Sequence, residues 1–275
     1  MKKKYLLPLG LWVLFEAIAV AFWLAFDHIF YLFNFTYIGT CLAVGIFLYV
    51  RKVKYVRNIL QFAVGLYMLI FLGIIGRENM QIEGFWYLLF LGVFQAAVIH
   101  YAVAKICGPL LFGRAWCGYA CWTAMVLDLL PYRTSETPRR KFGYIRYIVF
   151  LISLIFSIIL FLLRVPVLGD VMLYSFIIGN ILYYLIGVIL AFTLKDNRAF
   201  CKYVCPITVF LKPASYFSLL RIKTDTSRCV ACNKCVKICP MDVDMMNDSR
   251  KRRHGTECIL CLECVNVCPK KALHI

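Results

Sequence analysis

Two cysteine runs of the same spacing stand near the C-terminus: Cys229-x-x-Cys232-x-x-Cys235-x-x-x-Cys239-Pro240 and Cys258-x-x-Cys261-x-x-Cys264-x-x-x-Cys268-Pro269. Such a run offers three closely spaced thiolates to one iron–sulfur cubane, and its fourth cysteine, followed by proline, ligates the other cluster. The rule predicts two [4Fe–4S] clusters. The first would be held by Cys229, Cys232, Cys235 and Cys268, and the second by Cys258, Cys261, Cys264 and Cys239.

Zinc and disulfide interpretations of these cysteines fit less well. Zinc sites prefer two separated Cys pairs around one tetrahedral ion, and disulfides are not expected in a reducing cytoplasm. The tail formed by residues 221–275 has few large apolar side chains and is near the lower limit for a core of its own. Bound metal must therefore supply much of its folding free energy, and we expect removal of iron to unfold it.

The rest of the chain is too apolar for a soluble domain. Of its 275 residues, 63% are hydrophobic and only 16% are charged, and the mean hydropathy is +0.78. Soluble domains are usually about 45–50% apolar and about 25% charged. The formal net charge of +17 points to the anionic lipid of an inner membrane face rather than to nucleic acid, because it is spread over so apolar a sequence.

Six stretches are long and apolar enough to be membrane spans. The first follows three lysines without a small-residue cleavage site, so we expect a span there and not a signal peptide. The six expected spans are Tyr5–Phe26, Ile29–Val50, Ile59–Ile75, Phe85–Ala104, Ile145–Leu163 and Met172–Leu194.

The basic residues of the connecting segments alternate between the two sides of the expected bundle. One side holds only Arg77 and Arg164, while the other holds the remaining loop lysines and arginines and the tail. The positive-inside rule then predicts a multi-pass protein of the cytoplasmic membrane with both termini and the clusters on the cytoplasmic side. Membrane lipid is accordingly an expected partner.

A second repeat lies outside the tail. Arg114-Ala-Trp-Cys117-Gly-Tyr-Ala-Cys121-Trp122 follows the fourth expected span, and Arg198-Ala-Phe-Cys201-Lys-Tyr-Val-Cys205-Pro206 follows the sixth. Both copies share Arg-Ala-aromatic-Cys-x-Tyr-x-Cys and follow a pair of spans, which indicates an internal duplication. Cysteines four residues apart on a helix or turn lie on one face.

The four motif cysteines, Cys117, Cys121, Cys201 and Cys205, suit three kinds of chemistry. Brought together, they could hold a third iron–sulfur cluster or a copper or other soft-metal ion, or they could work as redox dithiols. Buried thiols without a function are the plain alternative. Arg114 and Arg198 stand three residues before each first cysteine. They could offset thiolate or cluster charge, hold a quinone oxygen, or anchor lipid phosphate.

Other cofactors have weaker support. His28 and His100 are the histidines near the membrane, and they fall on different sides, so no heme is predicted. No nucleotide-binding motif is present. Glu16 in the first expected span and His100 in the fourth are candidates for a quinone site, because polar residues inside spans are functional by default.

The predicted fold class is a membrane all-α polytopic bundle with a small α+β domain of the bacterial ferredoxin type. We expect four segments. Residues 1–57 form a hairpin, residues 58–132 a hairpin with the first motif, residues 133–220 a hairpin with the second motif, and residues 221–275 the two-cluster domain.

Together these residues resemble the membrane ferredoxin-type family that includes NapH-type, NosR-type and CcoG-type proteins. The resemblance rests on the two ferredoxin runs and on the motifs Cys117-x3-Cys121 and Cys201-x3-Cys205-Pro206. Family members usually have proline after both pairs, whereas Trp122 follows the first pair here. Six spans also differ from the four usual for NapH-type proteins.

The resemblance implies electron transfer at a membrane, with quinone or quinol and a redox partner protein as the other participants. The direction of electron flow is left open, and so is the choice between a quinol dehydrogenase and a component without catalysis of its own. A copper or metal reductase, or an assembly factor that uses the paired cysteines, is the principal alternative. A redox sensor is the third.

Overall fold

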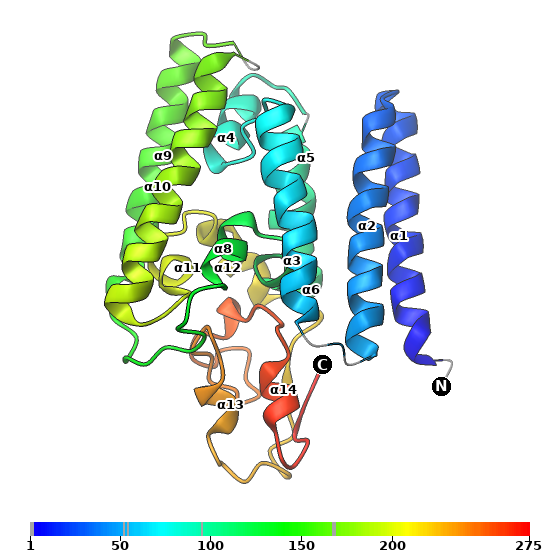
Figure 1. The fold of residues 1–275 in the computed structure, drawn as a ribbon, viewed down its shortest axis with the longest axis vertical. Coiled ribbons are helices and arrows are strands. Elements are labelled where there is room, and N and C mark those ends of the chain that lie inside the picture. Colours follow the sequence, from blue (N-terminus) through cyan, green and yellow to red (C-terminus); the bar gives the residue numbers. More distant parts are fainter. Residues whose placement is uncertain (1–2, 52, 54, 95, 167–168) are drawn as a thin grey trace.

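The computed structural model describes residues 3–51, 53, 55–94, 96–166 and 169–275. Two apolar helices, α1 (Lys3–Phe26) and α2 (Ile29–Val50), form a hairpin at the edge of the bundle (Figure 1). They turn at Asp27, whose φ is 50°. Two hydrogen bonds join them: Trp12 Nε1 donates to Thr40, and Thr36 donates to Glu16 Oε2.

Three more long helices complete the bundle. The first is α3 (Val56–Leu66), which continues as the π-helix η1 (Tyr67–Ile75). The others are α9 (Ile145–Leu162), preceded by η3 (Phe142–Tyr144), and α10 (Asp170–Leu194). Among the described residues five helices are long and apolar enough to cross a membrane: Pro8–Phe26, Ile29–Val50, Val56–Ile75, Phe142–Leu162 and Asp170–Leu194.

The prediction of one continuous helix over Phe85–Ala104 is wrong, while the number of times that the chain crosses the membrane stays a prediction. The chain forms α4 (Ile82–Phe90) and then a second helical segment made of α5 (Ala96–Tyr101), η2 (Ala102–Cys107) and α6 (Gly108–Phe112). The break follows from Gly92, which adopts a φ of +68°. The amide of Val93 then donates to Leu88 O at 2.9 Å and closes the end of α4.

Four short helices fill the space between the long ones: α7 (Ala115–Tyr119), α8 (Trp122–Leu127), α11 (Ala199–Tyr203) and α12 (Thr208–Tyr216). Figure 1 shows α8, α11 and α12 enclosed between α3 and α10. The duplicated motif therefore lies inside the bundle instead of in loops beyond its end.

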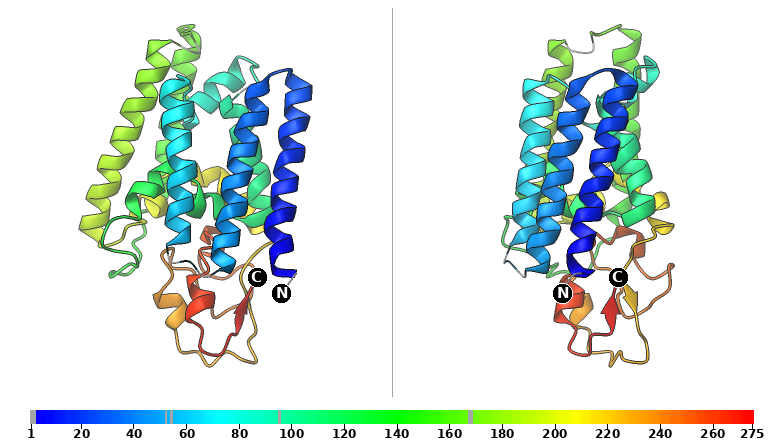
Figure 2. Two further views of the ribbon diagram at one scale, coloured as in Figure 1. Left: turned by 45° about the vertical axis from the view of Figure 1, so that its right-hand side comes forward. Right: turned by 90° about the vertical axis from the view of Figure 1, so that its right-hand side faces the viewer.

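The tail forms a small α+β domain at one end of the bundle, the end at which α1 also starts (Figure 2). Its elements are β1 (Lys223–Thr224), α13 (Lys234–Lys237), η4 (Gly255–Glu257), α14 (Glu263–Val267) and β2 (Leu273–His274). The two strands pair antiparallel, with Lys223 opposite His274. One apolar core joins this domain to the motif, because Cys117 and Phe200 belong to the same buried cluster as Ile259 and Met241.

Candidate metal centres

The two cysteine runs of the tail have the same backbone conformation. Ala231 and Asn233, on either side of Cys232, have φ of 52° and 60°. Leu260 and Leu262, on either side of Cys261, have φ of 50° and 64°. Positive φ is uncommon outside glycine. Positive φ at the equivalent positions of both runs curves the backbone of each, so that its cysteines can point toward a common centre.

Each run borders a cavity that also receives one distant cysteine. One cavity is lined by Cys229, Cys232, Cys235 and Cys268. The other is lined by Cys239, Cys258, Cys261 and Cys264. This grouping is the one that the spacing rule predicts, while the ligation itself stays a prediction. In the described part of the chain no three His, Cys, Asp or Glu side chains are placed to hold a single metal ion.

Backbone amides donate hydrogen bonds to two of these cysteine sulfurs, which also fits a [4Fe–4S] cluster. The amide of Val243 donates to Cys239 Sγ at 3.4 Å, and the amide of Ala272 donates to Cys268 Sγ at 3.3 Å. Both donors lie four residues after the cysteine that crosses to the other cavity. Hydrogen bonds of this kind stabilise thiolate charge and tune the potential of a cluster.

The two copies of the membrane motif also adopt one conformation. Arg114 and Arg198 precede five-residue helices, with φ and ψ of −91° and 27° and of −99° and 12°. Cys117 and Cys201 lie inside those helices and are 8% and 6% exposed. Cys121 and Cys205 follow just after them.

The arginine of each copy hydrogen-bonds to the other copy or to the helix that follows it, and these contacts hold the four thiols close together. Arg198 Nη1 donates to Cys117 O at 3.0 Å, and Arg114 Nη2 donates to Thr208 Oγ1 at 3.3 Å. The thiols are near enough to act on one another: burial raises the pKa of Cys205, and the charges of Cys117 and Cys121 raise it further.

Arg198 is held by a buried carboxylate. Its Nε and Nη2 donate to the two oxygens of Asp128 at 2.7 and 2.5 Å, and Arg57 Nη1 donates to Asp128 Oδ2 at 2.6 Å. Burial raises the pKa of Asp128, but the two guanidinium groups outweigh burial and hold this pKa below its usual range. Neither Arg198 nor Arg114, at 0% and 1% exposed, can reach a lipid headgroup.

Two cations beside the thiols have weaker partners. Lys105 is 3% exposed, and its Nζ lies 5.3 Å from the centroid of the Trp116 ring. The thiols of Cys117, Cys121 and Cys205 lie close enough to act on its charge. Arg114 leaves its Nε and Nη1 without a hydrogen bond among the described residues. A buried cation needs an anion. The nearest carboxylate to Arg114, at 4.0 Å, is shared with three other cations, and no carboxylate of the described residues pairs with Lys105, so this site fits a negatively charged group.

Sequence reasoning missed Glu257, which stands next to Cys258. The side chain is 1% exposed and is surrounded by four cationic groups. The shortest nitrogen–oxygen distances from Glu257 are 2.5 Å to Arg139, 3.1 Å to Arg146, 3.4 Å to Lys212 and 4.0 Å to Arg114. Burial raises its pKa, but the arginines outweigh burial and lower the pKa to about 2. No spacing signal marks such a residue, because its partners come from distant segments.

The second cysteine run packs directly on the first membrane motif. Tyr119 Oη donates to Leu260 O at 2.9 Å. A Cβ on Gly118 would lie 2.6 Å from Ile259 O, so the two backbones approach as closely as glycine permits.

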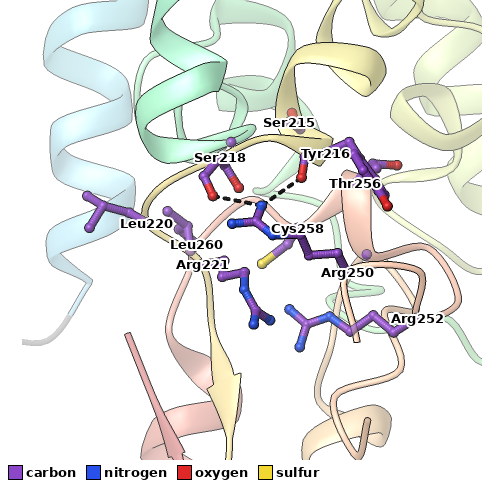
Figure 3. Close-up of a pocket in the computed structure, with 12 residues that line it drawn as sticks. Ser215, Tyr216, Ser218, Leu220, Arg221, Arg250, Arg252, Thr256, Cys258 and Leu260 are labelled. Carbon is purple, nitrogen blue, oxygen red and sulfur yellow. Dashed lines mark hydrogen bonds between the residues drawn. The ribbon is translucent and has the colours of Figure 1, made fainter. Parts of the chain in front are cut away.

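Nearby, Arg250 joins the tail to the end of α12 and the residues that follow it. Its Nη1 donates to Tyr216 O and Ser218 O at 2.7 and 3.0 Å (Figure 3). Cys258 and Leu260 lie beside this contact, so it helps to fix the second run against the bundle.

The two candidates for a quinone site lie apart. His100 belongs to α5, and its ring centroid lies 5.4 Å from that of Trp116, next to Cys117. Glu16 lies in α1 and accepts the hydrogen bond from Thr36 at 2.9 Å. The structure does not bring Glu16 to the motif.

Two family models match the chain. One, described as a 4Fe-4S dicluster domain, matches residues 228–273. The other, described as a 4Fe-4S binding domain, matches residues 102–145 and again residues 178–225, which contain the two copies of the membrane motif. The chain therefore contains ferredoxin-type 4Fe-4S domains, and its long apolar helices fit a membrane protein of this type. The double match of one family model supports the duplication seen in the sequence.

Similar proteins include two from Methanocaldococcus jannaschii. "Uncharacterized protein MJ0749" is 27% identical over 60% of this chain and 66% of its own length. "Uncharacterized protein MJ0750" is 26% identical over 57% of this chain and 74% of its own length. The Escherichia coli (strain K12) protein "Putative electron transport protein YccM" is 28% identical over 53% of this chain and 46% of its own length. The chain thus spans just under two thirds of the first relative and about half of YccM. No solved structure matches.

Proposed function

We propose that the chain is an integral membrane electron carrier that passes single electrons between a donor or acceptor in the membrane and two [4Fe–4S] clusters in its tail. The observation that carries this proposal is the direct contact of the second cysteine run with the first membrane motif through Tyr119 and Gly118. The name of the YccM relative supports the same role. Each cluster would supply one-electron chemistry.

A third [4Fe–4S] cluster at Cys117, Cys121, Cys201 and Cys205 is part of this proposal. A family model for 4Fe-4S binding matches both copies of the motif. The buried cations Lys105 and Arg114 favour a negatively charged group beside them. The protein residues would exclude water, neutralise charge through these cations and fix the thiols in place through the pairing of Arg198 with Asp128.

The iron content tests the third cluster. We expect about twelve irons per chain in the anaerobically purified protein, and about eight in a variant with Cys117→Ser and Cys201→Ser. A variant with Cys41→Ser and Cys107→Ser, which removes two thiols outside the motif, is the matched control and should keep about twelve. About eight irons in the unchanged protein, with tight copper binding abolished by Cys201→Ser and Cys205→Ser, would favour the metal reductase instead.

We also propose that the tail faces the cytoplasm and that both termini lie there. The start of α1, the end of α2, the start of α3 and the tail lie at one end of the bundle (Figure 1). Arg77 and Arg164 belong to connections at the other end, so the positive-inside rule favours this orientation. An impermeant maleimide should label a cysteine introduced at Leu163, which is 69% exposed, from the outside only.

The membrane quinone pool is the proposed donor or acceptor. In liposomes that hold the oxidised protein, a reduced menaquinol analogue should bleach the cluster absorbance, and the variant lacking Cys117 and Cys201 should not respond. If the clusters stay oxidised but dithionite reduces them, electrons enter from the cytoplasm, and a quinol donor is excluded for this protein.

A further inference from the structure

A cavity lies between the α1–α2 hairpin and the rest of the bundle. Its wall is mostly apolar and includes Phe35 and Ile38 from α2, Met68 and Leu72 from η1, Val103 from η2 and Trp116 from α7. Ligand sites in proteins are typically apolar concavities with a few polar groups that orient the ligand.

Two polar groups in this wall have atoms without partners. Glu78 Oε2 and His100 Nε2 are buried and have no hydrogen-bond partner among the described residues. A third polar group, Asn34, already accepts a hydrogen bond from Tyr67 at 3.0 Å. Leaving a buried polar atom unpaired is unfavourable, so these atoms indicate a polar ligand.

The cavity is also flanked by two π-helical segments, η1 and η2. Met68 and Leu72 come from the first, and Val103 and Ala104 from the second. The π-helix is rare and occurs frequently at functional sites. Two such segments on the wall of one cavity are an independent sign of a binding site.

The wall of the cavity leads to the membrane motif. Trp116, which precedes Cys117, lines the cavity, and the rings of His100 and Trp116 are 5.4 Å apart between centroids. The cation of Lys105 lies 5.3 Å from the centroid of the same indole. A ligand in the cavity would thus contact the first motif helix at Trp116, the residue before Cys117.

We propose that this cavity binds the ring of a membrane quinone, with Glu78 and His100 as hydrogen-bond partners of the quinone oxygens. This inference rests on the proposed function. A quinone has an apolar ring and two oxygens, which matches apolar walls with two unpaired polar groups. Glu78, in the connection between η1 and α4, was not predicted from the sequence; it takes the place of Glu16, which does not line the cavity.

The same two groups can accept the protons that quinol oxidation releases. Oxidation of a bound quinol breaks two O–H bonds, gives two electrons to one-electron acceptors, the iron–sulfur centres of the proposed function, and releases two protons. The Glu78 carboxylate and His100 Nε2 each take one proton. Burial raises the pKa of Glu78 to about 7, so the carboxyl can both take up and release a proton near neutral pH.

The test measures binding without electron transfer. The fluorescent quinol analogue 2-heptyl-4-hydroxyquinoline N-oxide is titrated into the oxidised protein in detergent, and quenching of its fluorescence gives the Kd. We expect Glu78→Gln and His100→Leu each to weaken binding about tenfold. Ala104→Leu, which fills the cavity, should abolish binding. Glu136→Gln, an exposed carboxyl-to-amide change, is the matched control and should bind like the unchanged protein.

Three outcomes would overturn the inference. One is unchanged binding in the three cavity variants. Another is a loss of binding in Glu16→Gln alone, which would move the site to the α1–α2 hairpin. The third is equal competition by phosphatidylglycerol without quinone, which would make the cavity a lipid site. The iron content is measured on the same samples, so a failure here is distinguishable from a failure of the proposed electron carrier.

Discussion

The molecule contains two internal repeats, and they are built differently. In the tail, the two cysteine runs are equivalent, with positive φ at matching positions and an amide hydrogen bond to each crossing sulfur. In the membrane motif, the two copies share a backbone but differ in their partners. Arg198 makes two hydrogen bonds with Asp128, whereas Arg114 has two nitrogens without a hydrogen bond among the described residues and lies 4.0 Å from its carboxylate partner, Glu257.

The two repeats are therefore stabilised in different ways. The tail has only two-residue strands and short helices, so under the proposed ligation each half would depend on metal that the other half helps to hold. The membrane motif is enclosed by long helices and is held by buried ion pairs. Both copies contact the tail: Tyr119 of the first donates to Leu260 O, and Lys202 of the second pairs with Asp242 at 2.7 Å.

Iron removal should therefore have the largest effect and act on one repeat only. We expect an iron chelator under reducing conditions to unfold residues 221–275 while the helical bundle stays folded. Limited proteolysis followed by mass spectrometry should locate cleavage within the tail, and circular dichroism should retain most of the helical signal. A tail that resists protease after iron loss would contradict the proposed role of the metal in folding.

The buried pair in the second copy should give the next largest effect. Asp128→Asn leaves the buried Arg198 and the partly buried Arg57 without their carboxylate, and breaking a buried pair costs about 3–5 kcal/mol. Thermal unfolding in detergent should show this loss. Glu136→Gln breaks an exposed pair with Lys195 in which both side chains are 55% exposed, and it should cost less than about 1 kcal/mol. Equal effects of the two substitutions would show that Asp128 is not a structural anchor.

At the contact between the first copy and the tail, we expect that adding a single methyl group to Gly118 weakens the packing. Gly118→Ala would place a Cβ 2.6 Å from Ile259 O, and the backbone there must move. Overpacking of this kind costs about 1–3 kcal/mol. We expect faster hydrogen exchange in residues 257–262, with little change in α9. Gly143→Ala, where the nearest atom is the flexible end of Arg146 at 3.6 Å, is the control and should not alter exchange in that loop.

The sequence predicts these repeats well and their surroundings poorly. Cysteine spacing is local, so it groups the eight tail cysteines as the two cavities do. The apolar pattern locates the five long helices but not the break at Gly92, where one residue with positive φ interrupts an apolar run. Glu257 and Glu78 could not be recognised, because their importance comes from groups that distant segments bring to them.

The smallest effect concerns the pH dependence of the tail. Burial and then Arg139 lower the pKa of His254 to about 4, while Glu257 opposes the shift. Arg253 and Asp242 also face this imidazole. Between the usual histidine pKa of about 6.5 and this value, the unfolded tail binds more protons than the folded one, so its stability falls as pH falls through this range.

His254→Asn removes this titration and keeps a residue that tolerates the observed φ of 58°. The variant should lose less stability than the unchanged protein between pH 6.5 and pH 4, as measured by proteolysis of the tail at each pH. The difference should be modest, because the imidazole is only half-buried and solvent screens its neighbours. Parallel pH profiles for the two proteins would mean that other groups govern the acid sensitivity of the tail.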